Sequence, residues 1–475
     1  MSSILQRLRD MPNRRTWLTP AVAVAVLGGI VWLQLNLRKA SQRTLLAVVA
    51  LAGGVTLLQF PVLGPFVVVF AALLVDYSLG TGTAVALNVA TLLVPVALAL
   101  WAASELAHQR FRLTPSRITR PLLLFLAASL LSLWVGMVLW DPAVPRPENI
   151  LFVQLGQWGV FAVAGGAVLL VANVVRSEAA LKHLVYAFLA LAGIIVVGRY
   201  VPGFGAFIFR YVTFAYHRAP FWMLLTALAL GQLLYNRGLP VWGRLGLIAI
   251  LAAVLGYSFF DKQDSASTWV AVAVVVVVLV WFRYRRLRWL FLIPVLIALV
   301  TGVLTDAIWE FAGGEDEWLT SGGSRLALIE RVIEVTLRNP ITGLGPAAYR
   351  HYAAMQPLAY RGALWITPAI NSHNNYVDLF AHAGALGLGL FLWLMGEFGA
   401  LAVRLRPAAR SGFMSGYVHA MLAAWVGALV LMMFADWILP HVYNIGFGGF
   451  QASLLFWLFL GGLPALERIV NREAD

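Results

Sequence analysis

The chain has 475 residues, of which 61% are hydrophobic and only 12% are charged. Soluble domains carry about twice that charged fraction, and the mean hydropathy of +0.83 reflects apolar residues spread over the whole length. This composition excludes a soluble enzyme and predicts a polytopic membrane protein. The absence of cysteine excludes disulfide bonds and thiolate metal sites.

The net charge is +13. Because cytoplasmic loops of membrane proteins collect Arg and Lys, we attribute this excess to topology and predict no nucleic-acid partner.

Apolar runs of about 17–25 residues between polar, Gly or Pro breaks are typical of membrane-spanning helices. Fourteen such runs predict an all-α fold, and several of them are short. Two runs flank Pro61 and could instead form a re-entrant hairpin, so twelve spans are the alternative. In chain order the runs are Pro20–Leu35, Leu45–Phe60, Val62–Tyr77, Val85–Ser104, Leu122–Trp140, Leu151–Val174, Ala180–Val197, Phe221–Tyr235, Leu245–Phe260, Trp269–Trp281, Trp289–Asp306, Asn375–Leu401, Tyr417–Phe434 and Phe447–Leu463.

After residue 105 the short loops alternate in basic content, which predicts their orientation. Arginine-rich loops, such as the one from Arg110 to Arg120, are assigned to the cytoplasm together with both termini. The loops between them are assigned to the outside: Asp141–Asn149, Arg199–Arg218, Asp261–Thr268, Asp306–Ser372 and Asp436–Asn444. The chain therefore divides into N-terminal transmembrane helices (1–305), one large outside loop (306–372) and C-terminal transmembrane helices (373–475).

Two outside loops differ from the rest. The Arg199–Arg218 loop mixes arginines with aromatic residues and resembles a helix lying at the membrane interface. The 306–372 loop begins with an acidic, Gly-rich run, 313–317, which we interpret as solvated; a Mg²⁺ or Ca²⁺ site is the alternative, but no second carboxylate cluster supports it. It continues with apolar residues at three-and-four spacing, which predict an amphipathic helix with Ser324 as its cap and Asn339-Pro340 as its end.

His373 follows Asn371 and Ser372, both good helix caps, and precedes a long apolar run. We therefore expect it in a first helical turn, where the helix dipole favours the neutral imidazole. A neutral histidine at the membrane surface suits a general base that takes a proton from a hydroxyl. A histidine that only helps to cap the helix is the alternative.

Two arginines are candidates for binding an anion. Arg325 is expected in the first turn of the loop helix, where its charge is misplaced but where an anion would bind. Its planar guanidinium matches a phosphate in bidentate fashion. Arg218 lies just before a predicted span at the same membrane level. A solvated Arg325 and an interfacial, snorkelling Arg218 are the alternatives. Gly384, Gly387 and Gly389 predict a small-residue face for helix packing.

One motif resembles a known family. His373-Asn374, followed after nine residues by Gly384 and after two more by Gly387, is similar to the signature of the O-antigen ligase and polysaccharide polymerase superfamily of bacterial inner membranes. The resemblance covers about the last 150–200 residues. It includes Ser324-Arg325 at the start of the loop helix, the turn through Asn339-Pro340 and Gly343–Pro346, and the large loop before the histidine motif.

The resemblance implies a transmembrane glycosyltransferase of the lipid-sugar-using (GT-C-like) kind, with a periplasmic site and no metal or other cofactor. His373 would then be the base, supported by Asn374, Gly384 and Gly387, and Arg325 would bind the diphosphate of an undecaprenyl-linked glycan. Family members commonly carry a second arginine after a serine at the start of a span. The corresponding stretch here, Ser265–Thr268, has none, so Lys262 or Arg218 takes its place or the second contact is made differently.

Three functions are considered, the first two of which fit this resemblance and the third of which belongs to a different class. The first is an O-antigen ligase that transfers a glycan to lipid A–core. The second is a polymerase whose acceptor is another lipid-linked repeat unit. The third is a transporter of lipid-linked sugars, which should place its polar groups near mid-membrane and often contains inverted repeats. No internal repeat is apparent, and the polar residues concentrate in one outside loop, so a transferase is favoured.

Overall fold

The computed structural model describes residues 52–80, 86–261, 266–284, 323–356, 358–360, 363–365 and 371–474, with isolated positions between 286 and 315. Within these residues, eight helices are long and apolar enough to cross a membrane, or nine if the bent pair around Pro61 is one span. The predicted all-α polytopic fold is confirmed at this level. The run Pro20–Leu35 and most of Trp289–Asp306 lie outside the described residues, so the total of twelve to fourteen stays a prediction.

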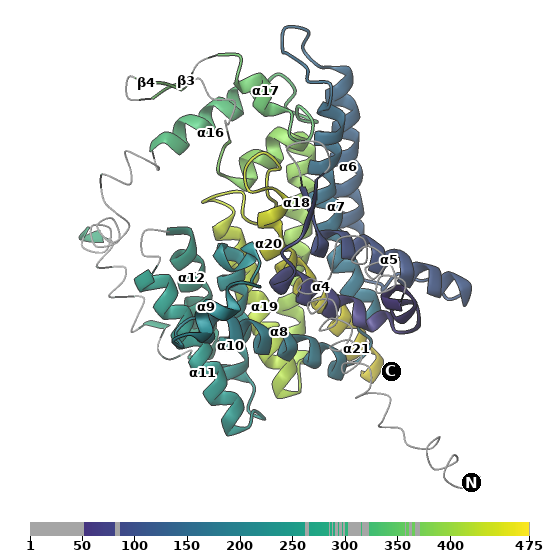
Figure 1. Ribbon diagram of the computed structural model, residues 1–475, viewed down its shortest axis with the longest axis vertical. Helices are drawn as coiled ribbons and strands as arrows, with labels where there is room; N and C mark the ends of the chain where they lie inside the picture. Colours follow the sequence, from purple (N-terminus) through teal and green to yellow (C-terminus); the bar gives the residue numbers. More distant parts are fainter. Residues whose placement is uncertain are drawn as a thin grey trace.

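Figure 1 shows a bundle of helices. The membrane-length helices of the first part are α5 (Val89–Ala107), α6 (Thr119–Val138), α7 (Ile150–Val174), α8 (Glu178–Gly198) and α11 (Val241–Gly256, continued by the π-helical η3, Tyr257–Asp261). Those of the last part are α18 (Asn375–Ala408), α19 (Gly412–Leu431) and α20 (Gly446–Leu460), which α21 (Gly462–Ala474) continues. Two shorter apolar helices are α10 (Ala219–Tyr235) and α12 (Ala266–Arg283). In Figure 1, α6, α7, α18 and α19 run near the vertical, and α5 and α8 run across it.

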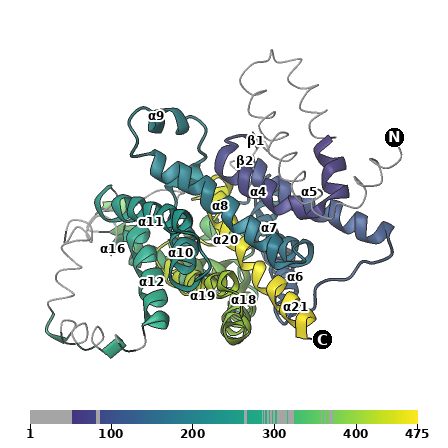
Figure 2. The same cartoon turned by 90° about the horizontal axis from the view of Figure 1, so that it is seen from below.

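Helix α10 lies at the centre of the bundle, among α8, α11, α12, α19 and α20 (Figure 2). Its sequence is apolar on every side, which is typical of a helix buried all round, and it buries thirteen of its residues, including Phe221 and Trp222. Helix α6 instead exposes Leu131, Trp134 and Val138 on one side. In a membrane protein such a face contacts lipid tails.

Proline and glycine interrupt the helices at two places in the N-terminal part of the chain. At Pro61 the helix 52–59 meets η1 (Pro61–Leu63) and α4 (Gly64–Leu74) at 112°, because proline interrupts the backbone hydrogen-bond ladder. The predicted interfacial helix over Arg199–Arg218 is wrong. This loop forms only α9 (Phe204–Ile208) and the 3-10 helix η2 (Phe214–His217), since Gly203 adopts a φ of 77°. Its Arg199 pairs with Asp261, with 3.0 Å between the guanidinium and the carboxylate.

Short strands, absent from the all-α prediction, form two hairpins. Strand β1 (Ser78–Gly80) pairs antiparallel with β2 (Ala86–Asn88), and β3 (Leu358–Tyr360) pairs antiparallel with β4 (Ala363–Trp365). The loop helix is present as α16 (Gly323–Thr336), followed by α17 (Tyr349–Ala353). By the bounds of α16, Ser324 lies within the helix and not at the position before it, which corrects the predicted cap position.

Loops assigned to the same side of the membrane meet at the same end of the bundle. At one end, where α21 ends (Figure 1), Arg176 pairs with Glu105, and Arg468 donates to the Thr114 hydroxyl at 2.7 Å. At the other end, the backbone amide of Asp141 donates to the Tyr352 hydroxyl at 3.1 Å. The arginine alternation read from the sequence therefore agrees with how the described helices are connected.

Helix α18 is broken at Gly384, whose φ of 66° and ψ of −171° are not helical. The turn after α16 fills the break: Leu344 N–H donates to the Ala381 carbonyl at 2.9 Å, and Ala385 and Leu386 donate to the carbonyls of Pro340 and Ile341 at 2.8 and 3.1 Å. A Cβ on Gly384 would lie 2.1 Å from the Ile341 carbonyl oxygen. Gly384 therefore serves a loop-to-helix contact.

The predicted glycine face for helix packing is wrong. Gly389 meets nothing within 4 Å, and a Cβ on Gly387 would meet Ala383 of the same helix at 2.2 Å.

We expect Gly384→Ala to destabilise the protein by at least about 2 kcal/mol, because it adds left-handed strain and a collision with backbone that cannot move aside. Thermal unfolding in detergent measures this. Gly389→Ala on the same helix is the matched control and should be neutral or stabilising by up to about 1 kcal/mol. Equal melting temperatures for the two variants would contradict the close contact between Gly384 and the turn after α16.

The predicted orientation can be tested because the chain contains no cysteine. Glu148 and Arg237 are both exposed and lie in loops assigned to opposite sides. In intact cells stripped of their outer membrane, a membrane-impermeant maleimide should label Glu148→Cys and not Arg237→Cys until the cells are lysed. Labelling of both residues before lysis would overturn the arrangement.

Candidate functional site

His373 lies one residue before the cap of α18. Asn374 is the N-cap, and its side-chain oxygen accepts from the backbone amides of Tyr376 and Val377 at 3.0 and 3.3 Å. The prediction that His373 occupies the first helical turn, capped by Asn371 or Ser372, is therefore wrong. His373 instead adopts a φ of 50°, a left-handed conformation that is uncommon outside glycine and needs local support.

Asn371 and Ser372 supply that support. The Asn371 side-chain oxygen accepts from the His373 backbone amide at 3.2 Å, and the Ser372 hydroxyl accepts from the Asn374 amide at 3.1 Å. Side chains of this type stabilise turns by bonding to the backbone two residues on. The Ser372 hydroxyl also donates to the Asp378 carboxylate at 2.7 Å. The polar residues around the histidine therefore shape the backbone that presents it.

Arg325 and His373 are brought together from different elements. Arg325 lies in the first turn of α16, as predicted, and its guanidinium donates to the Phe434 carbonyl at 3.3 Å. Burial lowers the pKa of His373, and the charge of Arg325 lowers it further, to about 4. The imidazole is therefore neutral at pH 7, as expected, but the cause is burial and a neighbouring cation.

The loop between α19 and α20 contacts both Arg325 and the start of α18. Asn375 ties the loop to α18: its side chain accepts from the amides of Ile438 and Leu439 at 3.0 and 3.2 Å and donates to the Leu439 carbonyl at 2.8 Å. Its backbone amide donates to the Met432 carbonyl at 2.8 Å. These four bonds hold the stretch that carries Phe434, and with it the position of Arg325.

A buried polar network lies behind the histidine. The Tyr349 hydroxyl donates to the Asp378 carboxylate at 2.8 Å, and it also lies 3.1 Å from the Asn371 side-chain oxygen. The Tyr349 ring stacks on His441, with ring centroids 5.0 Å apart. Asp436 accepts from the His441 backbone amide at 2.7 Å, and burial raises the pKa of this carboxyl. Asn371 thus links the backbone of His373 to a network buried within the bundle.

Sequence reasoning missed the members of this network. The available signal was weak: Asp378 lies in the first turn of α18, and Asp436 and His441 occupy a short loop between two apolar spans. Acidic residues near a helix N-terminus are common because they complement the helix dipole. Only the packing of α17 against α18 brings Tyr349 to them.

Arg218 lies against the same loop as Arg325. Its guanidinium carbon is 4.1 Å from the Phe214 ring centre and 5.3 Å from that of Trp437. Burial lowers the pKa of Arg218, and Asp436 opposes this shift. Its Nε is buried and makes no hydrogen bond within the described part of the chain. The half-buried guanidinium of Arg218 thus lies over two aromatic rings, and its Nε is shielded from solvent.

The other predicted residues divide into two groups. Asn374 and Gly384 have structural roles, as a cap and as the α18 break, and Gly387 packs within its own helix. Lys262 lies outside the described residues, so its place stays a prediction. Among the described residues, no group of three or more His, Asp or Glu side chains is arranged to hold a metal ion.

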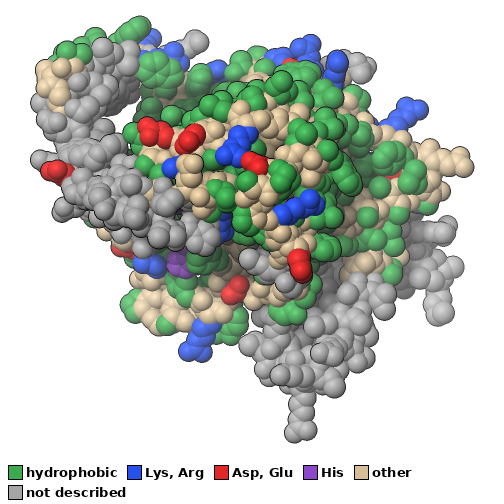
Figure 3. All heavy atoms as spheres, turned by 90° about the horizontal axis from the view of Figure 1, so that it is seen from above, with side chains coloured by type: hydrophobic (Ala, Val, Ile, Leu, Met, Phe, Trp, Pro, Cys, Tyr) green, Lys and Arg blue, Asp and Glu red, His purple; other side chains and the backbone are tan. Residues whose placement is uncertain are grey.

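Seen from the end that carries α16 and α17, the surface is largely hydrophobic with scattered acidic and basic side chains, and a histidine is visible beside a basic group (Figure 3). Neither of two cavities, of about 550 and 360 Å³, is lined by His373, Arg325 or Arg218. The site is therefore defined by convergent polar groups at a helix end.

Comparison with known proteins agrees with the motif. Residues 263–392 match the protein-family profile described as O-Antigen ligase, a stretch that contains both Arg325 and His373. No curated protein matches the chain.

We expect Arg325→Gln to raise the pKa of His373 from about 4, because it removes the cation and leaves only burial to lower the value. Diethylpyrocarbonate reacts with neutral imidazole, so its rate of reaction with His373 against pH, followed by mass spectrometry of that peptide, reports the pKa. Arg331→Gln, on the same helix but paired with Glu334, is the control and should leave the profile unchanged. An unchanged pH profile for Arg325→Gln would show that the charge of Arg325 does not act on His373.

Proposed function

Residues 263–392 place this chain in the O-antigen ligase-like superfamily, and on that premise we propose that it is an inverting, metal-independent O-antigen ligase of GT-C-like architecture. It would act in the bacterial inner membrane, with its site and the 306–372 loop facing the periplasm. The donor would be a glycan on undecaprenyl diphosphate and the acceptor lipid A–core. The observation that supports this best is a neutral, half-buried His373 that feels the charge of the Arg325 guanidinium at one helix end.

The arginines suit a diphosphate. Negative charge develops on the leaving diphosphate as its bond to the anomeric carbon breaks, and fixed cations that face this charge lower the barrier. Arg325 would present a planar fork to a phosphate. Arg218, which contacts the same α19–α20 loop, would contribute a second cation, whose Nε makes no hydrogen bond among the described residues. Of the two replacements considered for the family's second arginine, Arg218 therefore has structural support, and Lys262 remains a candidate outside the described residues.

His373 would take the proton of the acceptor hydroxyl as its oxygen attacks the anomeric carbon from the face opposite the diphosphate. A pKa of about 4 keeps the imidazole unprotonated but makes it a weak base. A bound diphosphate would neutralise Arg325 and so raise the pKa of His373 towards the value a base needs. Donor binding would thereby activate the base. Before the donor binds, His373 would be too weak a base to deprotonate an acceptor hydroxyl.

The acceptor separates the ligase from the polymerase of the same superfamily. Purified protein supplied with labelled lipid-linked glycan should transfer it to lipid A–core and not to a second lipid-linked glycan. Extension of the lipid-linked glycan would support the polymerase. Movement of the glycan lipid across a vesicle membrane without any transfer would support the transporter.

We expect His373→Ala to lower the transfer rate at least about 100-fold, the scale of a lost general base, at unchanged expression and melting temperature. Transfer in a reconstituted assay, with protein amounts matched, measures this. His183→Ala, at an exposed histidine of α8, should retain wild-type rates. Near-wild-type transfer by His373→Ala would leave this histidine with a purely structural role.

Arg325→Lys keeps the charge but removes the planar fork. We expect it to weaken donor binding by about one to two decades, the equivalent of a lost charge-assisted contact of about 1.5–3 kcal/mol, and Arg325→Ala to abolish transfer. Rates against donor concentration distinguish binding from folding, and Arg331→Lys is the control. An unchanged donor dependence in both Arg325 variants would show that the diphosphate is held elsewhere.

A further inference from the structure

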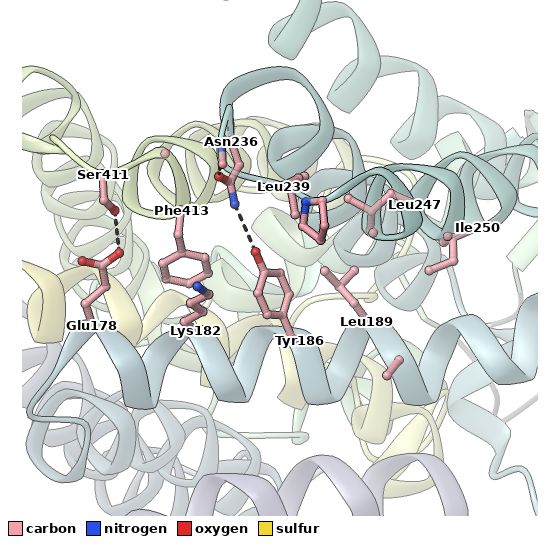
Figure 4. Close-up of a pocket in the computed structure, with 16 residues that line it drawn as sticks. Glu178, Lys182, Tyr186, Leu189, Asn236, Leu239, Leu247, Ile250, Ser411 and Phe413 are labelled. Atoms are coloured by element: carbon pink, nitrogen blue, oxygen red, sulfur yellow. Dashed lines mark hydrogen bonds between the residues drawn. The ribbon is translucent and has the colours of Figure 1, made fainter. Parts of the chain in front are cut away.

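A cavity of about 550 Å³ lies at the opposite end of the bundle from His373, bounded mainly by α8 and α11 and by the start of α19 (Figure 4). Helices α8 and α11 touch where Ile250 packs on Gly193, where an added Cβ would lie 2.7 Å from the isoleucine. Between this contact and Glu178, the cavity lies between α8 and α11. The lining runs along α8 from Glu178 to Ala190, about 18 Å at 1.5 Å per residue, which is roughly half of the apolar core of a bilayer.

The cavity is amphipathic along its length. Its deep half is apolar, lined by Leu189, Leu247 and Ile250, and its mouth carries Lys182 and Glu178 (Figure 4). Small residues form its outer edge: Ala190 of α8 and Gly246 of α11 are both exposed, and a Cβ on Gly246 would meet nothing within 4 Å. The cavity therefore opens sideways, to where lipid would lie.

The charges at the mouth favour an anion. Lys182 is exposed and forms no salt bridge among the described residues. Arg237 and Arg244 are exposed in and beside the α10–α11 loop, whose Gly238 and Pro240 line the mouth. The opposing carboxylate of Glu178 is hydrogen-bonded to the Ser411 hydroxyl (Figure 4). One lysine therefore lies at the mouth, with two more exposed cations on the adjoining loop and helix start, against one carboxylate that is already hydrogen-bonded. Basic pockets between helices at this level of a membrane bind anionic headgroups.

We propose that this cavity binds an anionic phospholipid of the membrane leaflet at that end, with one acyl chain between α8 and α11 and the phosphate at Lys182. The apolar depth excludes water and suits hydrocarbon, and the volume lies in the range of small-molecule sites, about 300–1,000 Å³. The site is separate from the transferase site and does not depend on the proposed function.

Native mass spectrometry of the full-length protein in detergent, titrated with phosphatidylglycerol or phosphatidylcholine, tests the proposal. We expect phosphatidylglycerol to bind at least about fivefold more tightly than phosphatidylcholine, because each interfacial cation contributes about that factor. Gly246→Leu places a side chain in the cavity and should weaken phosphatidylglycerol binding at least tenfold. Lys182→Gln should weaken it about fivefold and leave phosphatidylcholine binding unchanged.

Two matched controls accompany these variants. Gly396→Leu places the same side chain at another exposed glycine with nothing within 4 Å, and Arg404→Gln removes an exposed cation near the C-terminal end of α18, at the same end of the bundle. Both should bind lipid as the wild type does. Equal binding of the two lipids, or wild-type binding by Gly246→Leu, would overturn the proposal. Displacement of phosphatidylglycerol by millimolar inorganic phosphate would also overturn it, because it would identify a site for a free anion.

Discussion

The break of α18 at Gly384 is the constraint on which the site depends. A helix interrupted within a membrane leaves amides and carbonyls unsatisfied, and each costs several kcal/mol unless other protein groups pair with them. Here the turn after α16 supplies the partners, through backbone bonds from Leu344, Ala385 and Leu386. This contact anchors α16 and α17 against the first part of α18. As a result, Arg325 on one side of the turn and Tyr349 on the other have fixed positions relative to His373.

Polar burial around this anchor is extensive and much of it is hydrogen-bonded, but Asp378 Oδ2 and the Nε2 atoms of His382 and His441 make no hydrogen bond among the described residues. Asn375 alone makes four hydrogen bonds to the α19–α20 loop and to α19's last turn. Most buried polar groups in proteins are hydrogen-bonded, so each exception needs an explanation. The Nε of Arg218, whose guanidinium lies over two aromatic rings, is likewise buried without a hydrogen bond among the described residues. Under the proposed function it would face the donor diphosphate.

The two ends of the bundle offer different environments to lipids. At the His373 end, cations converge on a helix terminus and a loop, as a diphosphate headgroup requires. At the other end, α8 and α11 diverge from the Gly193–Ile250 contact and leave an open, largely apolar cavity with a basic mouth. Glycines permit both: Gly384 lets a loop approach a helix backbone, and Gly246 leaves space between two helices. At Gly384 the backbone conformation and the close approach of the loop require glycine. At Gly246 the absence of a side chain leaves the space that forms the cavity.

Hydrophobicity read along the chain was sufficient to predict a polytopic helical membrane protein, because a spanning helix needs a continuous apolar stretch of defined length. The His373 motif and the α16 pattern are likewise local, so the resemblance to the O-antigen ligase family and the position of Arg325 in a first helical turn followed from sequence. Where His373 sits relative to its helix did not follow. Asn371, Ser372 and Asn374 are equally good caps by residue type, and the choice among them depends on Tyr349, Asp378 and the α19–α20 loop. The low pKa of His373 and the burial of Arg218 are also products of tertiary packing, because burial and the distance to another charge exist only when segments far apart in the chain meet.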